Sequence, residues 1–181
     1  MTRRELLRSM GYIGCMLLTG SFSYASVSGI RGLSEGARSL NLYSVNTGES
    51  LKVAYWVDGE YIDSSLKEIN WLLRDYRSGE VAPVDLKLLD LLFLITRLSN
   101  RERIEVISGY RSPSTNAYLH RTKRGVAKDS YHTRGRAVDI RLEGMSLSSL
   151  RDLAINLRAG GVGYYPRSGF VHLDTGPFRC W

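Results

Sequence analysis

The segment from Asp85 to Leu98 is apolar on nearly every side and is interrupted only by Lys87, Asp90 and Arg97. A helix that is hydrophobic all round is stable only when other elements cover it. Its longest apolar run, Leu88–Ile95, contains Asp90 and is far shorter than the roughly 20 residues that a bilayer span requires. We therefore expect a central buried helix inside a globular core, and no membrane span in this part of the chain.

Short strands and amphipathic helices surround this segment. Residues 40–45 and 51–57 alternate apolar and polar side chains around Asn46-Thr47-Gly48, which predicts a hairpin. The apolar spacing in Ser64–Tyr76 predicts a helix. Further strands are expected at Ile104–Ile107, Ala137–Leu142, Val162–Tyr165 and Phe170–Leu173, and further helices from Pro113 to about Thr122 and at Ser146–Arg158. Hairpins without regular strand–helix crossovers favour the α+β class.

Residues 1–25 have the organisation of an export signal. Arg3 and Arg4 precede the low-charge segment 10–24, and Ser23-Tyr24-Ala25 places small residues where a signal peptidase reads. Paired arginines followed by two leucines resemble a bacterial twin-arginine signal. A general secretory signal that contains paired arginines is the alternative. Either route predicts a periplasmic or cell-envelope protein.

The remainder of the chain has the length of one domain. Residues 26–36 are rich in Ser and Gly and are expected to form a flexible lead-in to a domain at 37–181. The chain has 25 Lys and Arg against 18 Asp and Glu, a net charge of +7. This balance permits an anionic partner but does not require one. Because an exported protein rarely meets nucleic acid, we expect no nucleic-acid partner.

Two of the three histidines lie in unusual settings in the last third of the chain. His132 ends a loop, and Asp139 lies within the apolar strand 137–142. A carboxylate in such a strand is costly unless it is paired or binds a metal. His172 is flanked by apolar residues on another expected strand. Two imidazoles and a carboxylate can form a three-ligand zinc site with a fourth position for water. Ordinary surface or core histidines, with Asp139 paired to an arginine, are the alternative.

The order of these motifs resembles the zinc D-Ala-D-Ala carboxypeptidase family, in the group that also contains lysostaphin and the hedgehog signalling domain. The shared features are Ser-Gly-Tyr-Arg-Ser, then His-x6-Asp, then a late His in an apolar strand. The similarity is greatest to MepK-like murein endopeptidases and spans residues 40–181. The resemblance implies a hedgehog-like α+β fold, with a small antiparallel sheet that carries the metal site and packs against helices. It implies His132, Asp139 and His172 as zinc ligands and Arg111 as the substrate-binding arginine.

The resemblance also implies an activity, the hydrolysis of peptide cross-links in bacterial peptidoglycan. Zinc would lower the pKa of a bound water and polarise the carbonyl under attack. The guanidinium of Arg111 suits a carboxylate or peptide carbonyl, because it offers two donors in a fixed geometry. A D-Ala-D-Ala-type carboxypeptidase and a non-catalytic, zinc-containing cell-wall binding module are alternatives. His172-Leu173-Asp174 also fits half of a non-haem iron oxygenase site, although such motifs usually find their second histidine later in the chain.

The general base is the point where the sequence departs from the family pattern. Several branches have an acidic residue three positions before the last histidine, where this chain has Gly169. No histidine stands two positions before the last histidine either, because that residue is Phe170. The nearest carboxylate is Asp174, which shares a strand face with His172 because side chains repeat every second residue. Asp174 could accept the proton of a zinc-bound water, or it could orient His172.

Overall fold

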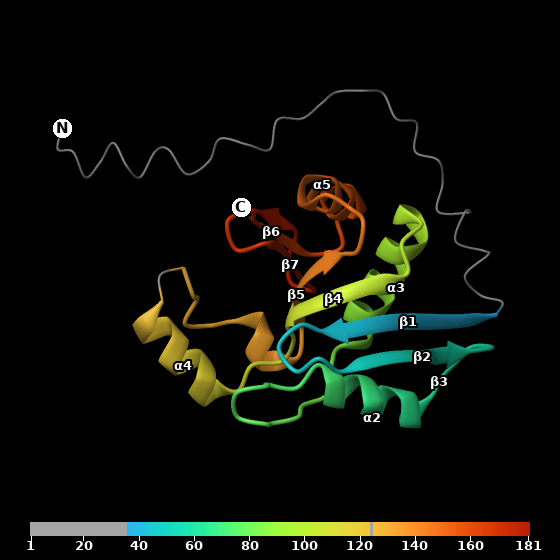
Figure 1. The fold of residues 1–181 in the computed structure, drawn as a ribbon, viewed down its shortest axis with the longest axis horizontal. Helices are drawn as coiled ribbons and strands as arrows, with labels where there is room; N and C mark the ends of the chain where they lie inside the picture. Colours follow the sequence, from blue (N-terminus) through green and yellow to red (C-terminus); the bar gives the residue numbers. More distant parts are fainter. Residues whose placement is uncertain (1–35, 124) are drawn as a thin grey trace.

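A computed structural model describes residues 36–123 and 125–181 (Figure 1). The expected signal at residues 1–25 and the lead-in as far as residue 35 lie outside the described residues. The elements are, in chain order, β1 (Ala37–Ser44), β2 (Ser50–Val57), β3 (Glu60–Tyr61), α2 (Asp63–Leu72), α3 (Leu86–Ser99), β4 (Arg103–Ser108), α4 (Pro113–Thr122), the 3-10 turn η2 (Tyr131–Arg134), β5 (Ala137–Leu142), α5 (Leu147–Leu157), β6 (Gly161–Tyr165), β7 (Phe170–Asp174) and β8 (Arg179–Cys180).

The strands form one mixed sheet with the order β3-β2-β1-β4-β5-β7-β6-β8. The α+β class is confirmed, but the expectation of a small antiparallel sheet is wrong. β4 pairs with β1 in parallel and β8 pairs with β6 in parallel, while the other neighbours are antiparallel. The β1–β4 pair is parallel because the chain passes through α2 and α3 before it returns beside β1. Alternating side chains report a strand, but they do not report the direction in which it pairs.

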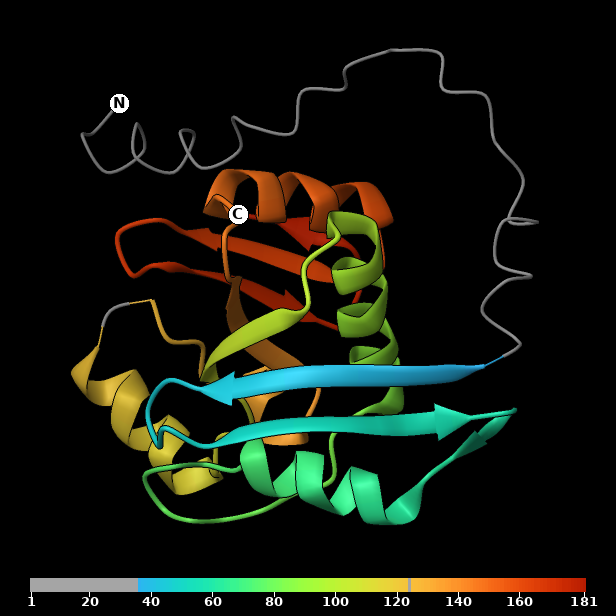
Figure 2. The same cartoon turned by 45° about the vertical axis from the view of Figure 1, so that its right-hand side comes forward.

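The core lies between the sheet and the helices α2, α3 and α5. α3 is the buried helix expected from the sequence, and Leu89, Leu92 and Ile95 in it are fully buried. Asp85 caps its first turn by accepting a hydrogen bond from the backbone N–H of Lys87. Figure 2 shows α4 standing apart from α3 and α5, beside the loops at one end of the strands. None of the helices in the described part of the chain is long and apolar enough to cross a membrane.

The alternation of side chains gives the central strands two different faces. In β5, Val138 and Ile140 join the core under the helices, and in β7, Val171 and Leu173 do the same. The intervening side chains, which include Asp139 and His172, lie on the opposite face because successive residues of a strand point to opposite sides. The core is therefore built by one set of residues, and the polar residues of the same strands are gathered on the other face.

Candidate metal centre

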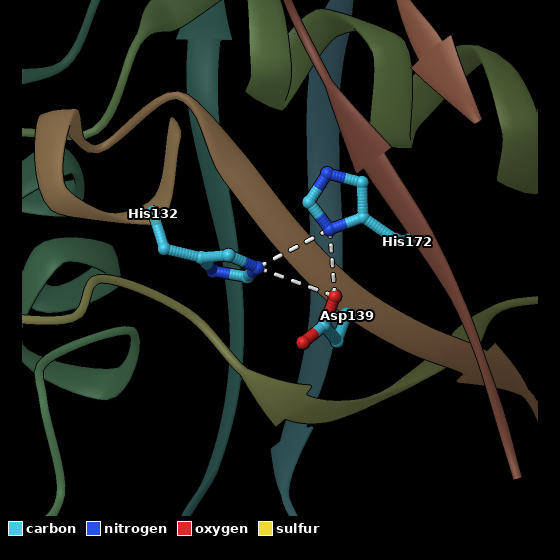
Figure 3. A group of neighbouring side chains, drawn as sticks. All are labelled: His132, Asp139 and His172. Carbon is cyan, nitrogen blue, oxygen red and sulfur yellow. Dashed lines mark hydrogen bonds and ion pairs between the residues drawn. The ribbon is translucent and has the colours of Figure 1, made fainter. Parts of the chain in front are cut away.

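Three segments bring His132, Asp139 and His172 together. Asp139 on β5 and His172 on β7 are direct partners in the antiparallel register. His132 lies on η2, and Gly135 ends that turn in the left-handed conformation, with φ 63°, so that the chain enters β5 beside it. This conformation favours glycine at position 135. Figure 3 shows that the three side chains point toward one another.

The spacing of their polar atoms fits a tetrahedral metal ion. His132 Nε2 lies 3.2 Å from His172 Nδ1 and 3.3 Å from Asp139 Oδ1, and His172 Nδ1 lies 2.8 Å from that same oxygen. Two ligand atoms on one zinc ion lie about 3.4 Å apart, because zinc bonds of about 2.1 Å diverge at the tetrahedral angle. The three residues form a group that could hold a metal, and they fit the expected ligand set.

Each imidazole contacts a hydrogen-bond acceptor through the ring nitrogen that faces away from the cluster. His132 Nδ1 lies 2.7 Å from the carbonyl oxygen of Gly109, and His172 Nε2 lies 3.0 Å from Asp174 Oδ2. A carbonyl oxygen only accepts, so His132 Nδ1 carries a proton and donates it, and in the neutral imidazole the lone pair of Nε2 then faces the cluster. A carboxylate on Nε2 of His172 leaves the lone pair of Nδ1 in the same way. Metal-binding histidines are commonly oriented by such partners.

The electrostatics keep the carboxylate of Asp139 ionised. Burial alone would raise the pKa of Asp139, but the charge and hydrogen bonds of His132 and the contact with His172 together lower it. Burial opposes the protonation of His172, whereas Asp139 and Asp174 raise its pKa. The net result is an anionic Asp139, which is the form that binds a cation.

Asp174 is fully buried and surrounded by donors. Its Oδ1 accepts hydrogen bonds from the backbone N–H groups of Gly161 and Gly176 at 3.2 and 2.8 Å and from Arg179 at 3.1 Å. Its Oδ2 accepts from Arg179 at 2.7 Å and from His172 at 3.0 Å. It therefore faces Nε2 of His172, while Asp139 faces Nδ1. Among the described residues, Asp174 is not part of the group that could hold a metal, and Arg179 contacts both of its oxygens, which disfavours the oxygenase alternative.

Arg111 lies beside the cluster and is largely buried. Its side chain is 12% exposed, and one Nη atom lies 4.0 Å from Asp139 Oδ2. Its two Nη atoms also donate hydrogen bonds to Asn116 Oδ1 at 3.3 Å and to Ser108 Oγ at 3.5 Å. Its Nε is buried and has no hydrogen-bond partner among the described residues.

The loop that carries Arg111 is anchored to the end of α2. The backbone N–H of Tyr110 donates to the carbonyl oxygen of Leu73 at 2.7 Å, and that of Arg111 donates to His132 at 3.1 Å. The buried carboxylate of Asp75 accepts from both the backbone N–H and the hydroxyl of Ser112, at 2.9 and 2.8 Å. These contacts also explain why α2 ends at Leu72 and not at Tyr76 as expected. The end of α2 instead supports the loop.

A cavity of about 600 Å³ opens over the cluster. His132, Asp139, His172 and Arg111 all line it. Its other walls are rich in basic and aromatic side chains, which include Arg77, Lys123, Arg179, Tyr131, Tyr165 and Trp181. The Trp181 ring lies 5.4 Å from the His172 ring, and its Nε1 donates to the Tyr165 hydroxyl at 2.7 Å. A cavity of this size and charge suits an anionic peptide.

Sequence reasoning missed three contributors to this site. Gly109 acts through its backbone oxygen, so its residue type gives no sign of the contact with His132. Arg179 and Trp181 lie on and just after β8, a strand of two residues that is too short for any alternating pattern. His120, the third histidine of the chain, is exposed on α4.

Comparisons with known proteins place the chain in one family over nearly its whole length. Residues 33–181 match the family model described as "Peptidoglycan L,D-endopeptidase MepK". The chain is 43% identical to the protein of that name in Escherichia coli strain K12 over 180 residues, which covers 99% of this chain and 96% of the relative. It is 45% identical over 146 residues to a probable peptidoglycan L,D-endopeptidase MepK of Haemophilus influenzae, covering 80% of this chain and 78% of the relative. No solved structure matches the chain, and the expected hedgehog-like fold stays a prediction.

Proposed function

Because this chain belongs to the peptidoglycan L,D-endopeptidase MepK family, it is a murein endopeptidase, and we propose that it works with a zinc ion held by His132, Asp139 and His172. The observation that carries this proposal is the convergence of two imidazole nitrogens and one carboxylate oxygen at zinc-ligand spacing. When bound there, zinc would supply a water of lowered pKa and would polarise the carbonyl of the scissile amide. The three residues that would hold the ion line the cavity, where a peptide can enter.

The chain's own residues prepare this chemistry. Asp139 is buried and anionic and offsets part of the charge of the ion. Gly109 and Asp174 fix the two imidazoles with their lone pairs toward it. We assign Asp174 this orienting role, the second of the two that the sequence left open, because its five hydrogen bonds occupy its oxygens and it is fully buried. A carboxylate oxygen has only about two lone-pair sites.

Arg111 is the proposed substrate-binding residue. Its guanidinium is close to Asp139 and lines the cavity, so an incoming carboxylate would gain charge-assisted hydrogen bonds from it. Peptidoglycan stem peptides carry such carboxylates next to their cross-links. We propose that Arg111 fixes the carboxylate beside the scissile amide, and that the bond cut is the cross-link between two diaminopimelate residues. Cross-links between D-Ala and diaminopimelate are the second candidate.

Digestion of purified peptidoglycan sacculi tests the reaction. The zinc-loaded full chain should release fragments whose masses identify the bond that was cut. His132→Ala, Asp139→Ala and His172→Ala should each lose both bound zinc and cleavage, whereas His120→Ala removes the third histidine of the chain from an exposed helix position and should retain both. Full zinc retention in any of the three variants would remove that residue from the ligand set.

The same digestion separates the alternatives. Release of single terminal D-Ala residues would make the protein a carboxypeptidase. Binding of sacculi and zinc without any released fragment would make it a binding module. Oxygen-dependent activity with iron would move it to the oxygenases.

We also propose that the protein acts in the periplasm and is exported by the twin-arginine route. The paired Arg3 and Arg4 of the expected signal support this proposal. Replacement of both by Lys preserves charge and should retain the protein in the cytoplasm. Normal export of that variant would favour the general secretory route instead.

A further inference from the structure

The carboxylate behind His172 is itself clamped by an arginine. Arg179 reaches both oxygens of Asp174, with Nη2 at 2.7 Å from Oδ2 and Nη1 at 3.1 Å from Oδ1. This two-pronged geometry fixes the plane of a carboxylate, which a single point charge does not. Asp174 Oδ2 is also the atom that accepts the Nε2–H of His172. A continuous chain of contacts therefore leads from Arg179 through Asp174 to the proposed ligand atom of His172.

The fold leaves Arg179 little freedom to move. Its backbone pairs with Gly161 in the parallel β6–β8 register. A side chain at Gly161 would not fit, because its Cβ would lie 2.5 Å from Asp174 Oδ2 and 2.6 Å from Arg179 Nη1. The guanidinium also lies over the rings of Tyr131, at 5.2 Å, and Trp181, at 5.0 Å. Because Gly161 has no side chain, Arg179 and Asp174 have the space for their two-pronged contact.

We propose that Arg179 is a positioning residue that, by holding Asp174, fixes the ring orientation and the Nε2–H tautomer of His172 for metal binding. The inference rests on the proposed function, since it concerns the affinity of the zinc site. Without the guanidinium, Asp174 keeps two backbone donors on Oδ1 but only His172 on Oδ2. The carboxylate could then rotate, and His172 would lose its fixed partner. Partners behind a metal-binding histidine typically change metal affinity by about 10–100-fold.

Zinc affinity in a double-mutant cycle tests the proposal. Arg179→Gln, Asp174→Asn and the double variant are made in the full chain, and zinc affinity is measured by competition with a chromophoric chelator. Arg167→Gln is the matched control, because Arg167 is an exposed arginine in the β6–β7 turn. If Arg179 acts through Asp174, Arg179→Gln should weaken zinc binding about 10-fold or more, and the double variant should be no weaker than Asp174→Asn alone.

Two further measurements separate positioning from simple stability. The visible spectrum of the cobalt-substituted protein should change in Arg179→Gln, because the spectrum reports the ligand geometry, and it should be unchanged in Arg167→Gln. Arg179→Lys retains the charge but not the two-pronged contact, so it should restore only part of the affinity. Denaturant unfolding of every variant accounts for general loss of structure.

The outcomes distinguish this inference from the proposed function. Wild-type protein that fails to bind zinc would overturn the proposed function, and the role of Arg179 with it. Wild-type protein that binds zinc while Arg179→Gln matches Arg167→Gln in affinity and cobalt spectrum would overturn the positioning role alone. Additive effects of Arg179→Gln and Asp174→Asn would also overturn it, because they would show that Arg179 acts independently of Asp174.

Discussion

Replacement of Gly109 by Ala should damage the site without touching a side chain that lines it. A Cβ at position 109 would lie 3.0 Å from the carbonyl carbon of Leu73 and closer still to its oxygen. The obstacle is backbone, so no rotamer change relieves it. The loop must retreat by roughly 1 Å to reach ordinary contact distances. Gly109 also accepts the hydrogen bond from His132, so that retreat moves a partner of the proposed metal ligand.

Two magnitudes follow from this geometry. Overpacking of this kind typically costs about 1–3 kcal/mol of unfolding free energy. A misplacement of about 1 Å near reacting groups can cost about 10²-fold in rate. The loop carries Arg111 as well, so kcat/KM for cross-link cleavage should fall by about that factor, and zinc affinity should weaken. Urea unfolding, chelator competition and digestion of cross-linked muropeptides measure the three effects.

Gly59→Ala is the control for general destabilisation. Gly59 lies in the β2–β3 turn with φ at 101°, and a Cβ there meets nothing within 4 Å. The left-handed conformation costs alanine about 1–2 kcal/mol, so stability should fall while the rate is maintained. If Gly109→Ala retained the wild-type rate and zinc affinity, the tight contact between the 109–112 loop and Leu73 would not be what positions the site.

Three further predictions concern single carboxylates and the cleft arginine. Arg111→Lys should lower kcat/KM by about 10–100-fold at unchanged zinc content, since a charge-assisted hydrogen bond contributes about 1.5–3 kcal/mol; an unchanged rate on muropeptides would remove Arg111 from substrate binding. Asp174→Asn should weaken zinc affinity and activity together by about 10–100-fold, whereas a fall of about 10²–10⁴-fold in kcat with intact zinc affinity would return Asp174 to the role of general base. Burial alone would raise the pKa of Asp75, but hydrogen bonds from Thr115, Ser112 and Arg77 together lower it from 3.8 to about 2. A carboxyl whose pKa is lowered by folding stabilises the fold at pH values above its pKa in the unfolded chain. Wild type should therefore exceed Asp75→Asn by about 2 kcal/mol in free energy of unfolding near neutral pH, and this difference should disappear as the pH falls from about 4 to about 2. Denaturation curves in which the difference persists at low pH would contradict this.

The elements in which apolar residues recur at a regular spacing were predictable from the sequence. The hairpin around Asn46-Thr47-Gly48, the buried helix α3 and the strands β5 and β7 all follow from the spacing of apolar residues. That spacing also placed Asp174 on the same strand face as His172, which their hydrogen bond confirms. Periodicity is local, and these elements need only local information.

The parts that depend on distant pairing were not predictable in this way. The parallel β1–β4 pair is set by how α2 and α3 pack, which no single segment specifies. The support of His132 by Gly109 and of Asp174 by Arg179 uses a backbone oxygen and a two-residue strand. Such contacts have no sequence period. The proposed ligands could be predicted because a carboxylate in an apolar strand is unusual. The residues that orient those ligands have no unusual sequence context.

Asp139 and His172 are partners across β5 and β7, so these two proposed ligands meet only when the strands pair in the native register. Ser108, Asp139, His172 and Gly163 form one row across β4, β5, β7 and β6. A slip of β7 by one residue would turn His172 toward the helices and bring Val171 or Leu173 to the open face. A chain that pairs these strands wrongly therefore cannot assemble the ligand set, however compact it is. If these three residues are the ligands, as proposed, metal binding would report the native strand register, because only correctly paired molecules could hold the ion.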